Sequence, residues 1–141
     1  MTIPTTLLEI HQYSEEGYKP LIDYGAWRVA ILRYIDELLP ENISKMQRHN
    51  ETDEVFVLLK GRCILFIGEG DERIAQIYAE DMKPLKLYNV KRSCWHTHTL
   101  SEGTTVLIVE NRDTSLNNSP EIDLTPLQIA SLEELTQNLW R

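Results

Sequence analysis

Two histidines, a glutamate and a glutamine stand at positions from which they could bind one metal ion. These residues are Gln47, His49, Glu54 and His96. Because successive side chains of a strand point to opposite faces, Gln47 and His49 should share a face of their short segment. Glu54 begins the strand after the polar turn at residues 50–53, so it can fold back beside His49. Two neutral imidazoles and a carboxylate suit a first-row divalent metal such as zinc, iron, manganese or nickel, and the Gln47 amide oxygen could supply a fourth, weak ligand.

Side chains in phase with these residues are candidates for a proton-transfer group and for a pocket wall. His98 should face the same way as His96, so it is either an acid or base near the metal or an ordinary polar residue of the barrel. Cys94 is also in phase with His96, and we favour a small buried side chain over a reactive thiol. Phe56 and Leu58 share the strand of the candidate glutamate and are expected to form the apolar wall.

Each candidate also has a purely structural interpretation. His49 could be a buried histidine that is satisfied by Glu54 alone, which would remove most of the argument for an enzyme. Arg28 and Arg33 lie in opposite phase on an early strand. One of them could point inward and bind a carboxylate or phosphate through its planar guanidinium group. We nevertheless expect a solvated sheet edge for both arginines.

The elements that must position these residues are short strands separated by polar turns. The expected strands cover residues 27–34, 55–59, 63–67, 74–78, 85–90, 96–100 and 105–109. Residues 38–44 contain proline and asparagine and are predicted to be a connection. Short strands at this spacing indicate a sandwich or barrel and argue against βαβ units, so the fold class is all-β.

The last part of the chain predicts one helix. Thr125, Pro126 and Gln128 form a capping box, in which the threonine caps the helix and the glutamine lies three residues later. Apolar residues then recur at the helical period. They are Leu127, Ala130, Leu132, Leu135 and Leu139. We expect this amphipathic helix to pack on the outside of the barrel or on a second subunit, with a separate partner protein as the alternative.

Composition narrows the class of protein and of partner. The 141 residues carry a net charge of −8, which argues against nucleic acid and against an anionic membrane surface. No apolar run approaches the ~20 residues that span a bilayer, and residues 1–7 do not resemble a secretory signal. Cys63 and Cys94 form no disulfide framework. We therefore expect a cytoplasmic protein with reduced thiols.

The chain is expected to form a single domain with three parts. Residues 1–24 would be an N-terminal arm and edge strand, residues 25–115 the barrel, and residues 116–141 a C-terminal segment that contains the helix. A chain of this length can bury a substantial core, because folding hides roughly 70% of the surface of a 150-residue chain.

The segment that carries the candidate ligands resembles the first motif of the cupin family. That motif runs His-x-His, three or four residues, Glu, six residues and Gly. His49, Glu54 and Gly61 match its second histidine, its glutamate and its glycine. Gln47 stands where the first histidine would be, which lowers the expected metal affinity. Type I phosphomannose isomerases, which are distant cupin relatives, also place a Gln-x-His pair at their zinc.

The second cupin motif, Pro-x-Gly-x-x-His, resembles residues 91–96. Lys91 replaces the proline and Ser93 replaces the glycine, so only His96 is retained. The resemblance spans residues 27–109. It implies a double-stranded β-helix, the jelly-roll barrel of the cupins, with the amphipathic helix appended at its C-terminal end.

The resemblance also implies two classes of function. One is a metal-dependent isomerase, lyase or dioxygenase that acts on a small polar molecule, with His98 as the candidate proton shuttle. The other is a non-catalytic module that binds or senses a small molecule without metal. Small cupins usually form homodimers through edge strands or by exchanging an N-terminal segment, and the apolar run at residues 7–10 would suit such an exchange.

Overall fold

Alternating burial along the strands sets the architecture. In β4 (Glu54–Lys60) the first, third and fifth side chains are buried, whereas Val55 and Val57 between them are only half-buried. β9 (Thr105–Asn111) shows the same alternation and buries Val106, Ile108 and Glu110. One face of each strand therefore points into the barrel, as the period of two requires.

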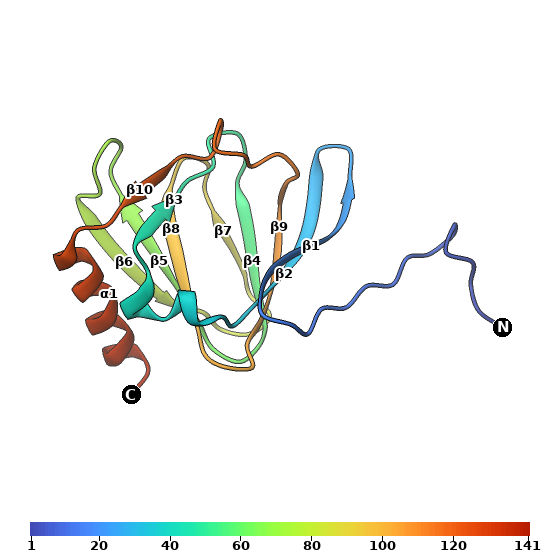
Figure 1. The fold of residues 1–141 in the computed structure, drawn as a ribbon, viewed down its shortest axis with the longest axis horizontal. Helices are drawn as coiled ribbons and strands as arrows, with labels where there is room; N and C mark the ends of the chain where they lie inside the picture. Colours follow the sequence, from blue (N-terminus) through green and yellow to red (C-terminus); the bar gives the residue numbers. More distant parts are fainter.

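The computed structural model describes residues 1–141, and its strands form two five-stranded sheets (Figure 1). Sheet A contains, in spatial order, β1 (Gly17–Tyr24), β2 (Trp27–Arg33), β9, β4 and β7 (Leu87–Val90). Sheet B contains β10 (Glu121–Asp123), β3 (Lys45–Gln47), β8 (Trp95–Leu100), β5 (Cys63–Glu69) and β6 (Gln76–Asp81). All pairs are antiparallel, and most spatial neighbours are not neighbours in the sequence. This is the jelly-roll arrangement that the sequence predicts.

Two apolar cores hold the molecule together. The first fills the space between the sheets and includes Phe56, Leu58 and Ile108. The second lies on the outer face of sheet B, where Ile64 and Phe66 of β5 form a cluster that includes residues of the C-terminal helix. Sheet B is therefore covered on both faces.

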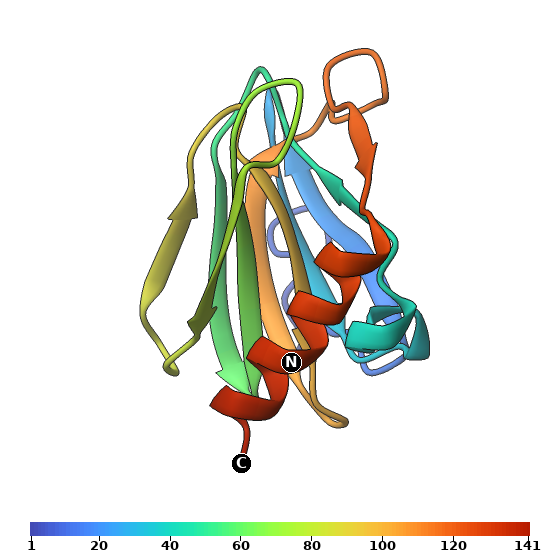
Figure 2. The ribbon, with the colours of Figure 1, turned by 90° about the vertical axis from the view of Figure 1, so that its left-hand side faces the viewer.

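The predicted helix is present as α1 (Pro126–Leu139), and its capping box is formed as expected. Backbone N–H of Gln128 donates to Thr125 Oγ1, and the Thr125 backbone N–H donates to Gln128 Oε1. α1 lies beside sheet B (Figure 2), with Leu132 fully buried. Leu127 is 84% exposed, so the apolar stripe that contacts the barrel is shorter than the predicted one.

The predicted connection at residues 38–44 contains more regular structure than expected. Two short 3₁₀ helices, η1 (Asp36–Leu38) and η2 (Pro40–Asn42), precede β3. β10 was not predicted, and it pairs with β3 as an edge strand of sheet B. β6 begins two residues later than predicted, because residues 70–75 form a turn in which Ala75 N–H donates to Glu69 O. β3 and β10 have only three residues each, which is too short to show a period in the sequence.

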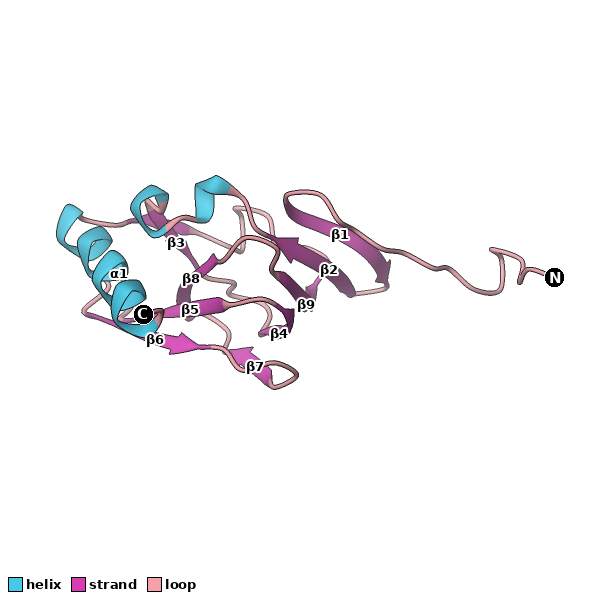
Figure 3. Cartoon of the chain, turned by 90° about the horizontal axis from the view of Figure 1, so that it is seen from below, coloured by secondary structure: helices cyan, strands magenta, loops and turns pink.

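The N-terminal segment leaves the barrel at β1, which lies at the edge of sheet A. Residues 1–16 extend away from both sheets (Figure 3), and nearly all of their side chains are exposed. No helix in the structure is long and apolar enough to cross a membrane.

Candidate metal centre

A pocket of about 300 Å³ opens between the two sheets, and both sheets contribute to its lining. Glu54 comes from the start of β4 in sheet A, and His96 comes from β8 in sheet B. His49 lies in the loop between β3 and β4. The turn at residues 50–53 brings Glu54 back beside His49, as the sequence indicates.

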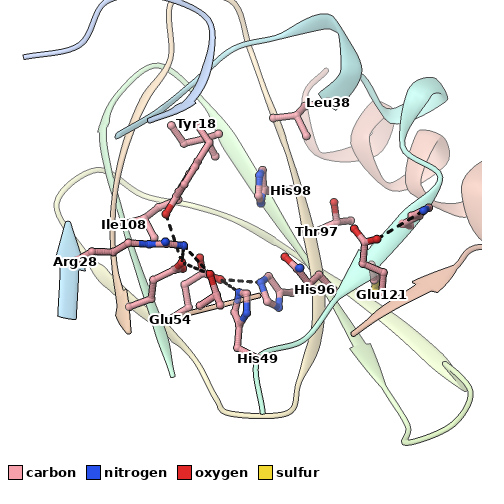
Figure 4. Close-up of a pocket in the computed structure, with 16 residues that line it drawn as sticks. Tyr18, Arg28, Leu38, His49, Glu54, His96, Thr97, His98, Ile108 and Glu121 are labelled. Atoms are coloured by element: carbon pink, nitrogen blue, oxygen red, sulfur yellow. Dashed lines mark hydrogen bonds and ion pairs between the residues drawn. The ribbon is translucent and has the colours of Figure 1, made fainter. Parts of the chain in front are cut away.

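The three side chains converge on one point (Figure 4). Oε1 of Glu54 lies 2.8 Å from Nε2 of His96 and 3.2 Å from Nε2 of His49. All three residues are only 6% exposed, and their ligand atoms lie within 4.8 Å of one another. His49 does not pair with Glu54 alone, so the purely structural interpretation is incomplete.

The hydrogen bond of His96 to the backbone fixes its tautomer. Nδ1 lies 3.0 Å from the carbonyl oxygen of Cys94. A carbonyl oxygen only accepts, so Nδ1 carries the hydrogen and donates it. In the neutral ring the lone pair is then on Nε2, which points at Glu54.

A chain of three side chains fixes the tautomer of His49 in the same way. The amide nitrogen of Asn118 donates to Glu51 Oε2 and to Asp113 O, both at 3.0 Å, which turns its Oδ1 toward Ser119. Ser119 Oγ donates to that Oδ1 over 2.8 Å. Its single hydrogen is thus used, so Ser119 Oγ accepts from His49 Nδ1 over 2.7 Å. The His49 lone pair is therefore also on Nε2.

This arrangement fits a divalent metal. With Nδ1 as the donor in both neutral rings, two Nε2 lone pairs and a carboxylate oxygen face one another, and this is a set of donor atoms that a divalent cation could hold together. The ligand atoms of all three residues lie within 4.8 Å of one another, so a single ion could contact all of them. Ligating histidines typically donate their other ring N–H to an acceptor, as both do here.

Gln47 also reaches the pocket. It pairs with His96 across β3 and β8, and its amide Nε2 donates to Ser119 O over 3.3 Å. That bond leaves the Gln47 carbonyl oxygen free for another partner. Gln47 is therefore near the three converging residues, while its bond to the backbone draws its amide group toward residue 119.

Several ionisable side chains lie close together at the candidate metal centre. Burial disfavours the charged form of Glu54, but the adjoining His49 and His96 side chains outweigh it and hold the pKa of Glu54 well below its usual range. Burial, and next the Glu54 carboxylate, raise the pKa of Glu110 to about 8. Arg28 Nη2 donates to Glu110 Oε1 over 2.5 Å and to Thr114 Oγ1 over 2.6 Å. Tyr18 reaches the same carboxylate oxygen at 3.4 Å.

The expectation of a solvated edge was wrong for Arg28. It points into the pocket because its position on β2 shares the phase of the buried Ala30 and Leu32. Arg33 has the opposite phase, and its guanidinium donates to Thr105 Oγ1 over 2.6 Å. The inward arginine thus binds a carboxylate, but that carboxylate is a residue of the protein.

His98 lies in the pocket lining on the same face of β8 as His96, as predicted. Its Nδ1 is buried and has no hydrogen-bond partner. Burial, and next the proximity of His96, lower the pKa of His98 to about 4, so its ring is neutral at neutral pH. The ring of Phe56 lies 5.8 Å away, centroid to centroid.

The predicted apolar wall was wrong. Phe56 and Leu58 point inward, but they are buried in the core, and neither lines the pocket. The apolar lining consists of Tyr18, Leu32, Leu38, Met46 and Ile108. Cys94 lies outside this pocket, in a half-buried position against the first core, which agrees with the structural interpretation that we favoured.

Sequence reasoning missed Glu110, Tyr18 and Ser119. Glu110 shares the phase of the buried Val106 and Ile108, and a charged residue in that phase was a signal that could have been used. Ser119 lies in a loop of no regular pattern, so nothing in the sequence marked it.

Comparisons with known proteins identify the fold. No family model and no curated protein matches the sequence. Among solved structures, the nucleoside dehydratase Pac13 has a TM-score of 0.55 and 7% identity, with 84% of this chain and 88% of Pac13 covered. A variant of PAC13 from Streptomyces, solved with uridine, has a TM-score of 0.53 and 8% identity over 86% of this chain and 97% of that one. The fold is that of a cupin.

A cupin-2 domain protein from Shewanella frigidimarina also matches, with a TM-score of 0.45 and 16% identity over 77% of this chain and 88% of that one.

Two positions of the sequence motifs, Gly61 and Ser93, have a left-handed backbone. Gly61 has a φ of +87°, and a Cβ there would lie 2.3 Å from Thr104 Oγ1. Ser93, which replaces the motif glycine, keeps the left-handed backbone with a φ of 66°.

Proposed function

We propose that this protein is a metal-dependent enzyme that acts on a small polar substrate. His49, Glu54 and His96 would hold the metal, with Gln47 as a fourth, weaker ligand. The observation that carries the proposal is the convergence of two imidazole nitrogens and one carboxylate oxygen on one buried point, which is a donor set that suits a divalent cation. Zinc, iron, manganese and nickel all suit these ligands.

The pocket supports a small substrate. At about 300 Å³ it lies at the lower end of the range for ligand pockets, enough for a molecule of about the size of a sugar. Its mouth carries a pair of opposite charges, Lys45 and Glu121, whose atoms lie 3.6 Å apart. Its apolar side can pack against one face of a ring or chain, while the polar side offers hydrogen bonds.

The chemistry that we favour is proton transfer, as in an isomerase or lyase. When bound, the metal would supply a Lewis acid that polarises a substrate carbonyl or hydroxyl. His98 offers an unpartnered Nδ1 beside the site, and we assign it the transfer of the proton. Arg28 fixes Glu110 against the opposite wall, and the Oε2 of Glu110, which has no partner within the protein, can form a hydrogen bond with a substrate hydroxyl. Of the three kinds of enzyme that the resemblance implies, the third is a dioxygenase, and its chemistry would require a redox-active metal.

The comparison with Pac13 supports including lyase reactions in a screen. Pac13 is described as a nucleoside dehydratase, and the structure of a PAC13 variant from Streptomyces was determined with uridine. At 7% and 8% identity the likeness is one of fold. The net charge of −8 supports a small molecule over a nucleic acid as partner. A cytoplasmic location is part of this proposal.

The second candidate function is a metal-free binding or sensor module. It is favoured by Gln47 in place of a histidine and by the mutual pairing of Arg28 with Glu110, which occupies two groups that a substrate could use. In such a module His49, Glu54 and His96 would contact one another without a metal between them.

Metal content decides between the two functions. Protein without an affinity tag is measured by plasma mass spectrometry, alongside His49→Ala and the matched control His11→Ala, whose ring is exposed in the N-terminal arm. We expect about one equivalent of a single transition metal in the wild type and the control, and none in His49→Ala. Absence of metal from all three after addition of zinc, iron, manganese and nickel would refute the metalloenzyme. A substrate screen with the identified metal, with His98→Asn as the second variant, then tests catalysis.

A further inference from the structure

Residues 112–119, which we call the strap, cross from sheet A to sheet B. They follow β9 and lead to β10, so the strap passes over one end of the barrel (Figure 1). Thr114 lines the metal pocket, so the strap forms part of the pocket wall. Ser119, at the other end of the strap, accepts the hydrogen bond from His49 Nδ1. One short segment therefore borders the pocket and orients a proposed metal ligand.

Arg28 fixes the first end of the strap at two points. Its Nη1 donates to the carbonyl oxygen of Arg112 over 2.9 Å, and its Nη2 donates to Thr114 Oγ1 over 2.6 Å. Both bonds come from a charged guanidinium group, and such bonds are roughly twice as strong as those between neutral groups. The planar fork of an arginine can hold separate acceptors at once, which the ammonium of a lysine on its flexible stem does less well.

The pocket wall holds Arg28 itself in place (Figure 4). Glu110 Oε1 accepts from Nη2 of Arg28 over 2.5 Å, and the guanidinium carbon lies 5.5 Å from the centre of the Tyr18 ring. The Arg28 side chain is 17% exposed and the Glu110 side chain 3% exposed. Because these partners belong to β9 and β1, the arginine joins the strands of sheet A to the strap.

Hydrogen bonds within the strap connect this anchor to the other end. The backbone oxygen of Asp113, between the two residues that Arg28 holds, accepts from the Asn118 side-chain amide over 3.0 Å. Asn118 Oδ1 accepts from Ser119 Oγ over 2.8 Å, and Ser119 Oγ accepts from His49 Nδ1 over 2.7 Å. A continuous series of contacts therefore runs from Arg28 to His49 through the strap.

We propose that Arg28 is a positioning residue of the metal centre, which holds the strap so that Ser119 directs the lone pair of His49 toward the metal. This inference rests on the proposed function, because it concerns the same metal site. It assigns the inward arginine a role other than binding substrate. Both Nη atoms are already directed at the strap, and one of them also at Glu110.

Electrostatics alone predicts the opposite effect of removing Arg28. A positive charge near a metal site repels the cation, so its loss should raise the metal affinity or leave it unchanged. If Arg28 acts through the strap, its loss should lower the metal affinity, because His49 is no longer held in one orientation. The sign of the change therefore separates the two effects.

The test measures the zinc affinity of the full chain with a chromophoric chelator. We expect Arg28→Met to bind zinc about 10-fold more weakly than the wild type, at the lower end of the loss that follows removal of an outer partner. Arg33→Met is the matched control. Arg33 lies on the same strand, and its guanidinium donates to Thr105 Oγ1 over 2.6 Å, away from the pocket lining. Its loss should leave the zinc affinity unchanged.

A second variant keeps the charge of Arg28. Thr114→Val removes one acceptor on the strap with little change in shape, and it should also weaken zinc binding. Circular dichroism shows whether each variant is folded. If Arg28→Met does not fold, Thr114→Val decides, and unchanged zinc affinity in that variant would overturn the inference.

A double variant shows whether Arg28 acts through Ser119. Arg28→Met combined with Ser119→Ala should bind zinc no more weakly than Ser119→Ala alone, because the bond that the strap positions is already absent. Additive losses would overturn the inference. So would a zinc affinity of Arg28→Met at or above that of the wild type, and either result would leave the metal site in place. Absence of zinc binding in the wild type would instead overturn the proposed function, and this inference with it.

Discussion

Ser119 lies 2.7 Å from Nδ1 of His49 and holds the histidine lone pair toward Glu54. Ser119→Ala removes that acceptor, so the ring is free to rotate or to change tautomer. Loss of such an outer partner typically lowers metal affinity 10- to 100-fold. We expect a decrease of about that size, measured with zinc against a chromophoric chelator.

Ser115→Ala is the control for this variant, because Ser115 is exposed in the same loop and its side chain does not contact the site. It should bind zinc as the wild type does. An unchanged affinity in Ser119→Ala would show that the Nδ1 hydrogen bond does not position His49.

Removal of the metal should destabilise the folded protein. A ligand that binds only the folded state stabilises it by about 2.7 kcal/mol when its free concentration is 100 times its Kd. Chelator should therefore lower the melting temperature of metal-loaded wild type in differential scanning calorimetry. His49→Ala should melt at one temperature with and without chelator. Identical melting of the wild type in both conditions would contradict the metal site.

The two thiols should react at very different rates. Burial raises the pKa of both, but Cys63 is fully buried whereas Cys94 is half-buried. Because the thiolate is the reactive form, a thiol reagent should modify one cysteine in the folded protein and the second only after unfolding. Peptide mass spectrometry should assign the first to Cys94. Early modification of Cys63 would mean that β5 opens without global unfolding.

The capping box should stabilise α1 measurably. Thr125→Ala removes the acceptor for the Gln128 backbone N–H, and loss of such a cap costs about 1 kcal/mol. For a chain of this length that corresponds to a fall in melting temperature of about 2–4 °C. Thr125→Ser keeps the hydroxyl and should retain most of the stability. Equal losses in both variants would show that packing of the threonine methyl is the cause.

The sequence predicted which side chains of each long strand point inward, but not which of them reach the pocket and which lie in the core. A period of two places Phe56 and Leu58 on the inner face correctly, yet it cannot say that Glu54 reaches the pocket while the next two inward residues lie in the core. The inward position of Arg28 follows the same period, and only its charge argued for a solvated position.

The candidate ligands could be found from the sequence because His49 and Glu54 are close along the chain and share one turn. The residue that orients His49 could not be found in this way. Ser119 is seventy residues away in the sequence and meets His49 only in the folded structure. β10, which follows that loop, has three residues and thus no pattern of its own. Long-range partners in irregular segments are the part that local periodicity does not encode.

The loop that holds Ser119 also receives hydrogen bonds from the backbone of Arg48 and Asn50, on either side of His49. During synthesis all three proposed metal ligands emerge well before this loop does. A nascent chain that stops short of residue 119 thus has the ligands without the contacts that hold one of them in place. Tight metal capture should therefore be a late event in the making of this protein, after β1 to β9 have already been synthesised.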